Sequence, residues 1–220
     1  MDRYFTEEEQ GRLLSVLKKV PAADLPARRD AAAIRALLHS GCRIGEFLRI
    51  SVGDALAALR ASYLFIPREH RKGRCADHQV FVTASLAEDL RELIRVRALM
   101  APGDCQTTDP LLVSRLGRGM SVRGFELRFK HWASAAGLPA DSSPHWMRHT
   151  RAMNIMRRST SRDPRGVVQR SLGHASITST GIYTETARED VEAALTEVDG
   201  QSGRVSARKL RHAWEGRVGA

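Results

Sequence analysis

Residues 144–156, PHWMRHTRAMNIM, combine a helix start with two basic side chains placed one turn apart. Ser143 precedes this segment as a candidate N-cap, and Pro144 suits the first helical position because that position needs no N–H donor. His145 and Arg148 then share one helix face, since residues three apart are neighbours on a helix surface. The apolar residues expected to anchor the helix in the core are Met147, Ala152, Ile155 and Met156. The segment therefore predicts a packed helix that presents a histidine and an arginine together.

Helical patterns recur on both sides of this segment. Thr6 and Glu9 form a capping-box pair ahead of an apolar periodicity, and Pro21 is expected to end that helix. Gly41 and Gly173 each follow a helical pattern as C-terminal stops. The ranges predicted to be helical are 5–20, 26–41, 43–54 as a short helix running into a turn, 85–100 capped by Ser85, 121–137 starting near Ser121, 163–173, 176–185 as a single turn, and 187–198.

The pattern changes between residues 55 and 83. The segments 55–67 and 78–83 predict two or three strands, joined by the basic, glycine-containing hairpin 68–77. The chain contains no internal repeat and no long linker. The sequence thus predicts a mainly α fold with a small antiparallel β-sheet, of the α+β class.

The composition favours a partner that carries many negative charges. The 220 residues include 35 Lys and Arg against 25 Asp and Glu, which gives a formal charge of +10. Such a charge favours nucleic acid, although a solubilising surface would have the same charge. No apolar run reaches the roughly 18 residues of a membrane span, and the polar N-terminus does not resemble a signal peptide. We therefore expect a cytoplasmic protein without a membrane partner.

The three cysteines are Cys42, Cys75 and Cys105. Their odd number and wide spacing indicate reduced thiols, and no CxxC pair suggests a zinc site. Cys42 stands beside Arg43 and is a candidate nucleophile, but a small packed residue is the better interpretation.

Six scattered side chains have chemistry suited to a functional site. They are Arg43, Lys72, His145, Arg148, His174 and Tyr183. Each has an ordinary alternative when taken singly. Arg43 can pair with Glu46 at a helix start, Lys72 can be a solvated hairpin lysine, and His145 a half-buried histidine. His174 can cap a helix, and Tyr183 can lie at the edge of a core.

Taken in order, these residues resemble the tyrosine recombinase, or phage integrase, family. The segment HSGCRIGEFLRISVGD, residues 39–54, resembles the first-arginine segment of that family, and PHWMRHT, residues 144–150, resembles its His-x-x-Arg-His-Thr helix. VVQRSLGHASITSTGIYTE, residues 167–185, is similar to its final segment, including the nine-residue step from His174 to Tyr183. Each motif alone is weak, but their combination in this order is specific.

The resemblance implies cleavage and rejoining of DNA through a covalent 3′-phosphotyrosine at Tyr183. Arg43 and Arg148 would clamp the non-bridging oxygens of the scissile phosphate, because guanidinium groups stabilise the charge that develops there. The phosphotyrosine retains the bond energy, so rejoining needs no ATP. We expect no metal and no other cofactor.

The proton transfers of this reaction would involve basic side chains. His145 is the candidate base for the tyrosine phenol, and Lys72 is the candidate acid for the departing 5′ oxygen. His174 would hydrogen-bond the phosphate or position the nucleophile, and His149 is interpreted as structural. The hairpin is about two residues longer than the usual form, so Arg71 and Arg74 compete with Lys72 as its basic tip.

The likeness covers about residues 4–195. We expect a catalytic domain at 1–198, a basic tail at 199–220, and no N-terminal core-binding domain. The chain would then be either a fragment or a short single-domain recombinase.

The expected partner is a double-stranded DNA recombination site at the bacterial nucleoid. Four protomers would assemble on two such sites, starting from a monomer or dimer in solution. The candidate DNA contacts are Arg71, Arg74, Arg123, Arg128 and Lys130, although solvated surface charges would look the same. Two other functions stay open: a type IB topoisomerase, and a DNA-binding regulator on this fold that does not cleave.

Overall fold

The computed structural model describes residues 4–71, 73, 76–101, 103 and 105–173. Predictions that concern Lys72, Arg74, Cys75, His174, Tyr183 and the helices at 176–185 and 187–198 fall outside these residues. The elements are α1 (Glu7–Lys18), α2 (Leu25–Ser40), α3 (Ile44–Phe47), α4 (Val52–Ala61), β1 (Tyr63–Ile66), the 3-10 helix η1 (Arg68–His70), β2 (His78–Phe81), α5 (Ala84–Met100), α6 (Val122–Ala135), α7 (Pro144–Arg158) and α8 (Pro164–Leu172).

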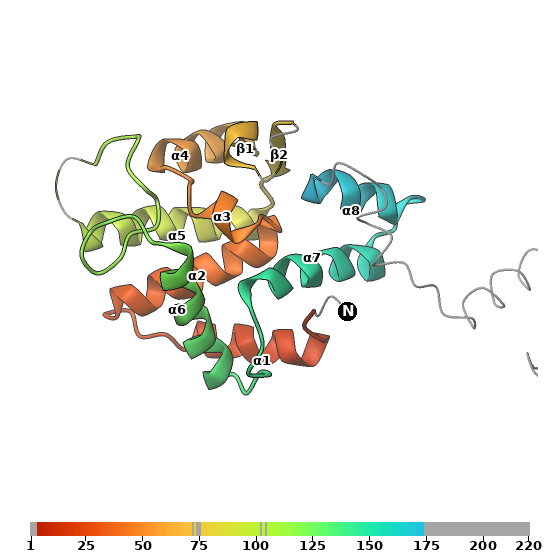
Figure 1. Cartoon of the computed structure of the whole chain (residues 1–220), viewed down its shortest axis with the longest axis horizontal. Helices are drawn as coiled ribbons and strands as arrows, with labels where there is room; N and C mark the ends of the chain where they lie inside the picture. Colours follow the sequence, from red (N-terminus) through yellow and green to blue (C-terminus); the bar gives the residue numbers. More distant parts are fainter. Residues whose placement is uncertain (1–3, 72, 74–75, 102, 104, 174–220) are drawn as a thin grey trace, which may run out of the picture. The chain divides into compact units, whose positions relative to one another are not determined.

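Helix α2 is the central element of the core. It packs along α5 and α7 and also touches α1 and α6 (Figure 1). Its alanines allow this close packing, because Ala32, Ala33 and Ala36 are completely buried. Ile34 and Leu37 fill the space between the helices. The end of α2 is thereby held next to α7, where the predicted site begins.

The sheet consists of β1 and β2, paired antiparallel with Leu64 opposite Val80. The strand prediction was wrong for residues 55–61, which belong to helix α4. Ser51 and Asp54 form a capping box at its start, and Ala55 and Ala58 are buried three residues apart, as a helix requires. The predicted α+β class is confirmed, with a sheet of two strands in the described residues.

Most predicted helix ends are confirmed. Thr6 and Glu9 make both bonds of the capping box of α1. Gly41 and Gly173 end α2 and α8 in the left-handed conformation, each with φ of 64°. The predicted cap Ser85 was wrong, because Thr83 accepts the hydrogen bond from the Leu86 amide and α5 begins two residues earlier. Two predicted boundaries also moved: α1 ends at Lys18, before Pro21, and residues 43–54 divide between α3 and the start of α4.

Helix α7 joins the main core to α8. Pro144 occupies its first turn as predicted, although the Ser143 side chain makes no capping bond. Met147 is buried in the main core, while Ala152 packs with Val168 and Leu172 of α8. Ile155 and Met156 are partly buried beside this second cluster. None of the helices in the described part of the chain is long and apolar enough to cross a membrane.

Candidate active site

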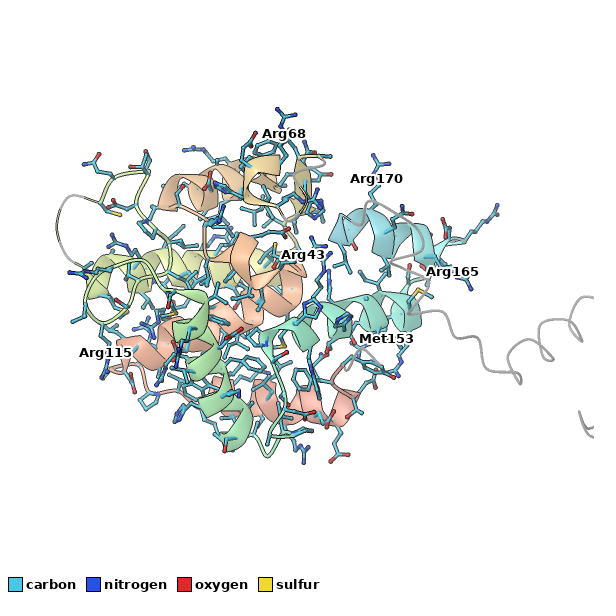
Figure 2. The ribbon with its side chains drawn as sticks, viewed as in Figure 1. Arg43, Arg68, Arg115, Met153, Arg165 and Arg170 are labelled. Atoms are coloured by element: carbon cyan, nitrogen blue, oxygen red, sulfur yellow. The ribbon has the colours of Figure 1, made fainter. Side chains whose placement is uncertain are left out.

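Arg43 stands where α2 ends and α3 begins. Gly41 ends α2 with a positive φ, and a methyl group there would collide with Leu172 Cδ2. The chain then turns so that Arg43 becomes the N-cap of α3 and donates from Nη1 to Glu46 Oε1 at 3.0 Å. The buried Glu46 carboxylate thus orients the guanidinium, while the Arg43 side chain stays 32% exposed. Figure 2 shows Arg43 near the centre of the view, whereas Arg68 and Arg170 extend outward.

Arg148 is buried on α7 and bridges two helix ends. Its Nη1 donates to the Gly41 carbonyl at 2.6 Å, and its Nη2 donates to the Leu172 carbonyl at 2.8 Å. The side chain is 2% exposed. Carbonyls at helix C-termini attract cations, so Arg148 fixes the ends of α2 and α8 against α7.

A cavity of about 550 Å³ brings Arg43 and His145 together. His145 lies exposed in the first turn of α7, and its ring contacts the ring of buried His149 at 4.4 Å between centroids. Ser121 and Val122, at the start of α6, also line the cavity. The other lining residues are Ile44, Gly45, Glu46, Leu48, Arg49, His70 and Met120. Two helix N-termini and several basic side chains therefore face one small space, which favours an anion.

Arg71 lies at the start of the hairpin and is held inside the site. Its Nη2 donates to the Gly173 carbonyl at 2.5 Å and its Nη1 to the Ala76 carbonyl at 2.6 Å. Its Nε lies 3.7 Å from Glu46 Oε1, so one carboxylate serves both Arg43 and Arg71. The Arg71 side chain is only 10% exposed. These internal contacts connect the hairpin to the end of α8, directly before position 174.

His78 on β2 packs against the same end of α8. A methyl group on Gly173 would lie 2.7 Å from both His78 Nδ1 and Arg71 Nη2, so only glycine fits there. Burial, followed by the charge of Arg71, lowers the pKa of His78 to about 4. The imidazole is therefore neutral at pH 7 and serves as packing beside the arginine.

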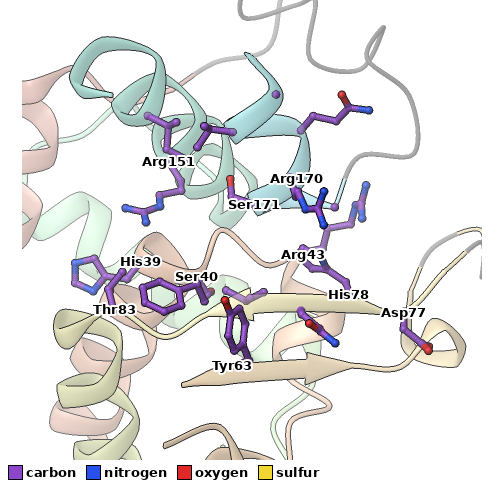
Figure 3. A pocket seen from close by; sticks show the side chains of 18 of the residues that line it. His39, Ser40, Arg43, Tyr63, Asp77, His78, Thr83, Arg151, Arg170 and Ser171 are labelled. Carbon is purple, nitrogen blue, oxygen red and sulfur yellow. The ribbon is translucent and has the colours of Figure 1, made fainter. Parts of the chain in front are cut away.

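A larger cavity of about 1320 Å³ lies between the sheet, the end of α2 and helices α7 and α8. Figure 3 shows Arg151 and His39 toward one side of it, and Arg43 and His78 toward the other. His39 Nδ1 lies 2.8 Å from Asp89 Oδ2, while burial lowers the pKa of Arg151. Arg43 lines both cavities and so stands between them.

The candidate DNA contacts on α6 differ in their surroundings. Arg123 and Lys130 are exposed. Arg128 instead binds the buried carboxylate of Asp30, with its Nε 2.6 Å from Oδ2, and Trp132 Nε1 donates to the same oxygen at 3.1 Å. Arg128 thus contributes to a buried network, whereas the other two are available to a partner.

Cys42 is buried, and its thiol is expected to be unreactive. Its side chain is 2% exposed, and burial raises the pKa of the thiol to about 11. The thiol is therefore protonated at neutral pH, in agreement with the interpretation as a small packed residue.

A model described as the phage integrase family matches residues 3–190 of the chain. The chain belongs to the phage integrase family. Tyrosine recombinase XerC of Ralstonia pickettii (strain 12J) is 32% identical over 178 residues, which are 78% of this chain and 53% of the relative. XerC 1 of Ralstonia nicotianae (strain ATCC BAA-1114 / GMI1000) is 34% identical over 179 residues, with the same coverage. This member of the phage integrase family spans about half the length of the curated relatives it matches.

The fold is also shared with solved recombinases. XerH, solved with a palindromic difH substrate as a post-cleavage complex, superposes with a TM-score of 0.67 at 20% identity. The match covers 89% of this chain and 53% of XerH. The catalytic-domain fold expected from the resemblance to the phage integrase family is confirmed.

Sequence reasoning missed several residues of this phage integrase family site. His70 and His78 line the two cavities although neither belongs to a recognised motif, and Arg49 lies in the segment 39–54 but was given no role. The only available signal for His70 was its place in the basic hairpin. In the described residues, no group of three or more His, Cys, Asp or Glu side chains is arranged to hold a metal ion.

Proposed function

We propose that the chain cleaves and rejoins DNA at a specific site through a 3′-phosphotyrosine on Tyr183. The observation that carries this proposal is the small cavity where Arg43, Arg49 and His145 meet the N-termini of α6 and α7. Such a cavity favours an anion, since basic side chains and the first residues of two helices line it. A phosphodiester of DNA is the anion that a chain of charge +10 attracts.

In this proposal the two arginines stabilise the pentavalent transition state in different ways. Arg43 is oriented by Glu46 and donates directly to a non-bridging oxygen of the phosphate. Arg148 donates to the carbonyls of Gly41 and Leu172, which fix its guanidinium between the ends of α2 and α8. From this fixed position it adds positive charge beside the phosphate.

The proton transfers follow from the same arrangement. Tyr183 attacks phosphorus as its phenol proton passes to His145, which stands exposed in the first turn of α7. The 5′ oxygen leaves with a proton, a role for which the family resemblance favours Lys72. His174 contacts the phosphate or the nucleophile, and Arg74, Arg123 and Lys130 remain candidate DNA contacts. Of the other two candidates, Arg71 is bonded to the carbonyls of Ala76 and Gly173 and Arg128 to Asp30. No metal is required, since guanidinium groups stabilise the developing charge.

The relatives support this reading of the chain. XerC carries the name tyrosine recombinase, and XerH was solved with its difH substrate after cleavage. By analogy, four copies of this chain would act on two DNA sites at the bacterial nucleoid, with a catalytic domain at 1–198 and a basic tail at 199–220.

Covalent capture tests the proposal. Duplexes of randomised sequence, each nicked one to a few nucleotides from a possible cleavage point, lose a short fragment on cleavage and trap the intermediate. We expect the full chain to form a denaturant-resistant protein–DNA adduct enriched in one sequence, and Tyr183→Phe to form none. Binding without any adduct would instead support a regulator, and adducts without sequence preference would support a topoisomerase.

A further inference from the structure

The N-terminal segment, residues 4–10, runs along one side of α7. The helix residues that it contacts recur about once per turn: Trp146, Thr150, Asn154 and Arg158. This spacing places them on one face of α7, whereas Arg148 projects from the opposite half toward the ends of α2 and α8. We propose that the N-terminal segment positions His145 and Arg148 for reaction at the phosphate, with Thr150 as the main positioning residue. The inference rests on the proposed function.

The Thr150 hydroxyl joins the N-terminal segment to the first turn of α7. Its Oγ1 donates to the Trp146 carbonyl at 2.8 Å and accepts from the Phe5 amide at 2.9 Å. Thr150 is completely buried and Phe5 is 2% exposed. Removal of the hydroxyl would therefore leave the Phe5 amide without its acceptor in the protein interior. One hydroxyl thus links the main chain of residue 5 to the main chain next to His145.

The Phe5 ring adds an apolar contact at the same place. Its centroid lies 5.2 Å from the ring of Trp146 on α7 and 6.3 Å from the ring of Phe129 on α6. The starts of these two helices both line the smaller cavity. One buried side chain therefore packs against both helices that form the proposed phosphate site.

The start of α7 depends on this anchor because the usual one is missing. The Ser143 side chain makes no capping bond, although side-chain caps commonly hold the first turn of a helix. His145 lies exposed in that turn. A displacement of about 1 Å can cost about 100-fold in rate, so the bonds of Thr150 bear directly on proton transfer to His145.

The contacts farther along α7 provide a matched control. Asn154 Nδ2 donates to Gln10 Oε1 at 2.9 Å, which is also a hydrogen bond between α7 and the N-terminal segment. Asn154 lies about two and a half turns from His145. Its loss should therefore leave the first turn in place.

Three variants test the positioning role. Thr150→Val keeps the branched shape and removes the hydroxyl, Thr150→Ser keeps the hydroxyl, and Asn154→Ala is the control. DNA affinity and the rate of adduct formation at saturating DNA are measured on the duplex recovered by covalent capture, well below every melting temperature. Hydrogen exchange of residues 145–149, followed by mass spectrometry, adds a measurement that does not depend on cleavage.

We expect Thr150→Val to lose at least about tenfold in rate at saturating DNA, with a DNA affinity within about twofold of wild type. Thr150→Ser and Asn154→Ala should stay within about threefold of the wild-type rate. Hydrogen exchange at 145–149 should accelerate in Thr150→Val alone.

A wild-type rate in Thr150→Val would overturn the proposal, and so would an equal loss in Asn154→Ala. A loss that disappears at saturating DNA would overturn it as well. If Thr150→Val does not fold, Phe5→Leu takes its place under the same criteria, since it loses the ring contact with Trp146. If the wild-type chain forms no adduct, the proposed function fails, and unchanged exchange at 145–149 would separately refute the anchoring of this turn.

Discussion

Arg148 donates a 2.6 Å hydrogen bond to the carbonyl of Gly41, 107 residues away in sequence. The same guanidinium holds Leu172 at the end of α8, so one buried side chain joins the segments that precede Arg43 and His174. The motifs that carry the proposed catalytic residues are therefore connected through main-chain carbonyls, and not only through the phosphate they are proposed to share.

Arg148→Lys tests this connection. Lysine cannot reach both carbonyls in a fixed geometry, and a buried carbonyl left without a donor is costly. We expect the free energy of unfolding to fall by about 2–4 kcal/mol, together with a loss of adduct formation of at least about 100-fold. Urea unfolding and covalent capture measure the two effects. Arg157→Lys, on an exposed part of the same helix, should change neither. Unaltered stability in Arg148→Lys would contradict the bridging role.

Gly173→Ala tests the contact between α8 and the hairpin. The added methyl group would collide with Arg71 and His78. In addition, the positive φ of this position is unfavourable for alanine. Gly137 has nearly the same φ, 63°, but no atom within 4 Å of an added methyl group. We expect thermal unfolding to show a loss of about 1 kcal/mol for Gly137→Ala and about 3 kcal/mol for Gly173→Ala. Equal losses would mean that the hairpin does not restrict this position.

His78 predicts a specific dependence of stability on pH. Its pKa in the folded chain is about 4, below the ordinary value of 6.5, so the unfolded chain binds the proton first as the pH falls. The stabilisation is complete above pH 6.5 and is lost as the pH falls toward 4. It amounts to about 3 kcal/mol. Urea titrations at pH 7.5 and 4.5 should show a decrease about 2 kcal/mol smaller for His78→Gln than for wild type. Parallel pH curves would contradict a buried, neutral His78.

Substitutions at Arg128 and Lys130 distinguish an internal contact from a DNA contact. Arg128→Gln removes a charged partner of the buried Asp30, so we expect a loss of about 1 kcal/mol in unfolding free energy. The salt dependence of DNA binding should stay unchanged. Lys130→Gln should leave stability intact and reduce the slope of log K against log salt by about one, if this side chain meets a phosphate. Binding titrations at several salt concentrations decide between the two roles.

Local signals predicted the parts of the fold that depend on neighbouring residues. The capping box of Thr6 and Glu9 and the glycine stops at Gly41 and Gly173 act within one turn of the chain. The strand prediction for residues 55–61 was wrong because a short apolar, alanine-rich run fits both a strand and a helix. The capping box of Ser51 and Asp54 favours the helix. These two residues lie just before the segment that was interpreted as strands.

Long-range contacts explain what the sequence did not predict in the site. Arg71 was interpreted as a residue of the hairpin tip, yet its guanidinium is bonded to Gly173, 102 positions away. His70 and His78 likewise line cavities whose other walls come from distant elements, among them α3, α6 and α8. No periodicity reports such contacts, whereas the ordered motifs predicted that Arg43 and His145 would meet.

The position of the covalent bond in the captured adduct tests the central claim most directly. The adduct formed by the full chain is digested with a protease and a nuclease, and the peptide that carries a nucleotide is sequenced by tandem mass spectrometry. We predict a 3′-linked nucleotide on Tyr183 within the peptide that follows Arg170. A nucleotide on any other side chain, or a 5′ linkage, would contradict the proposed chemistry.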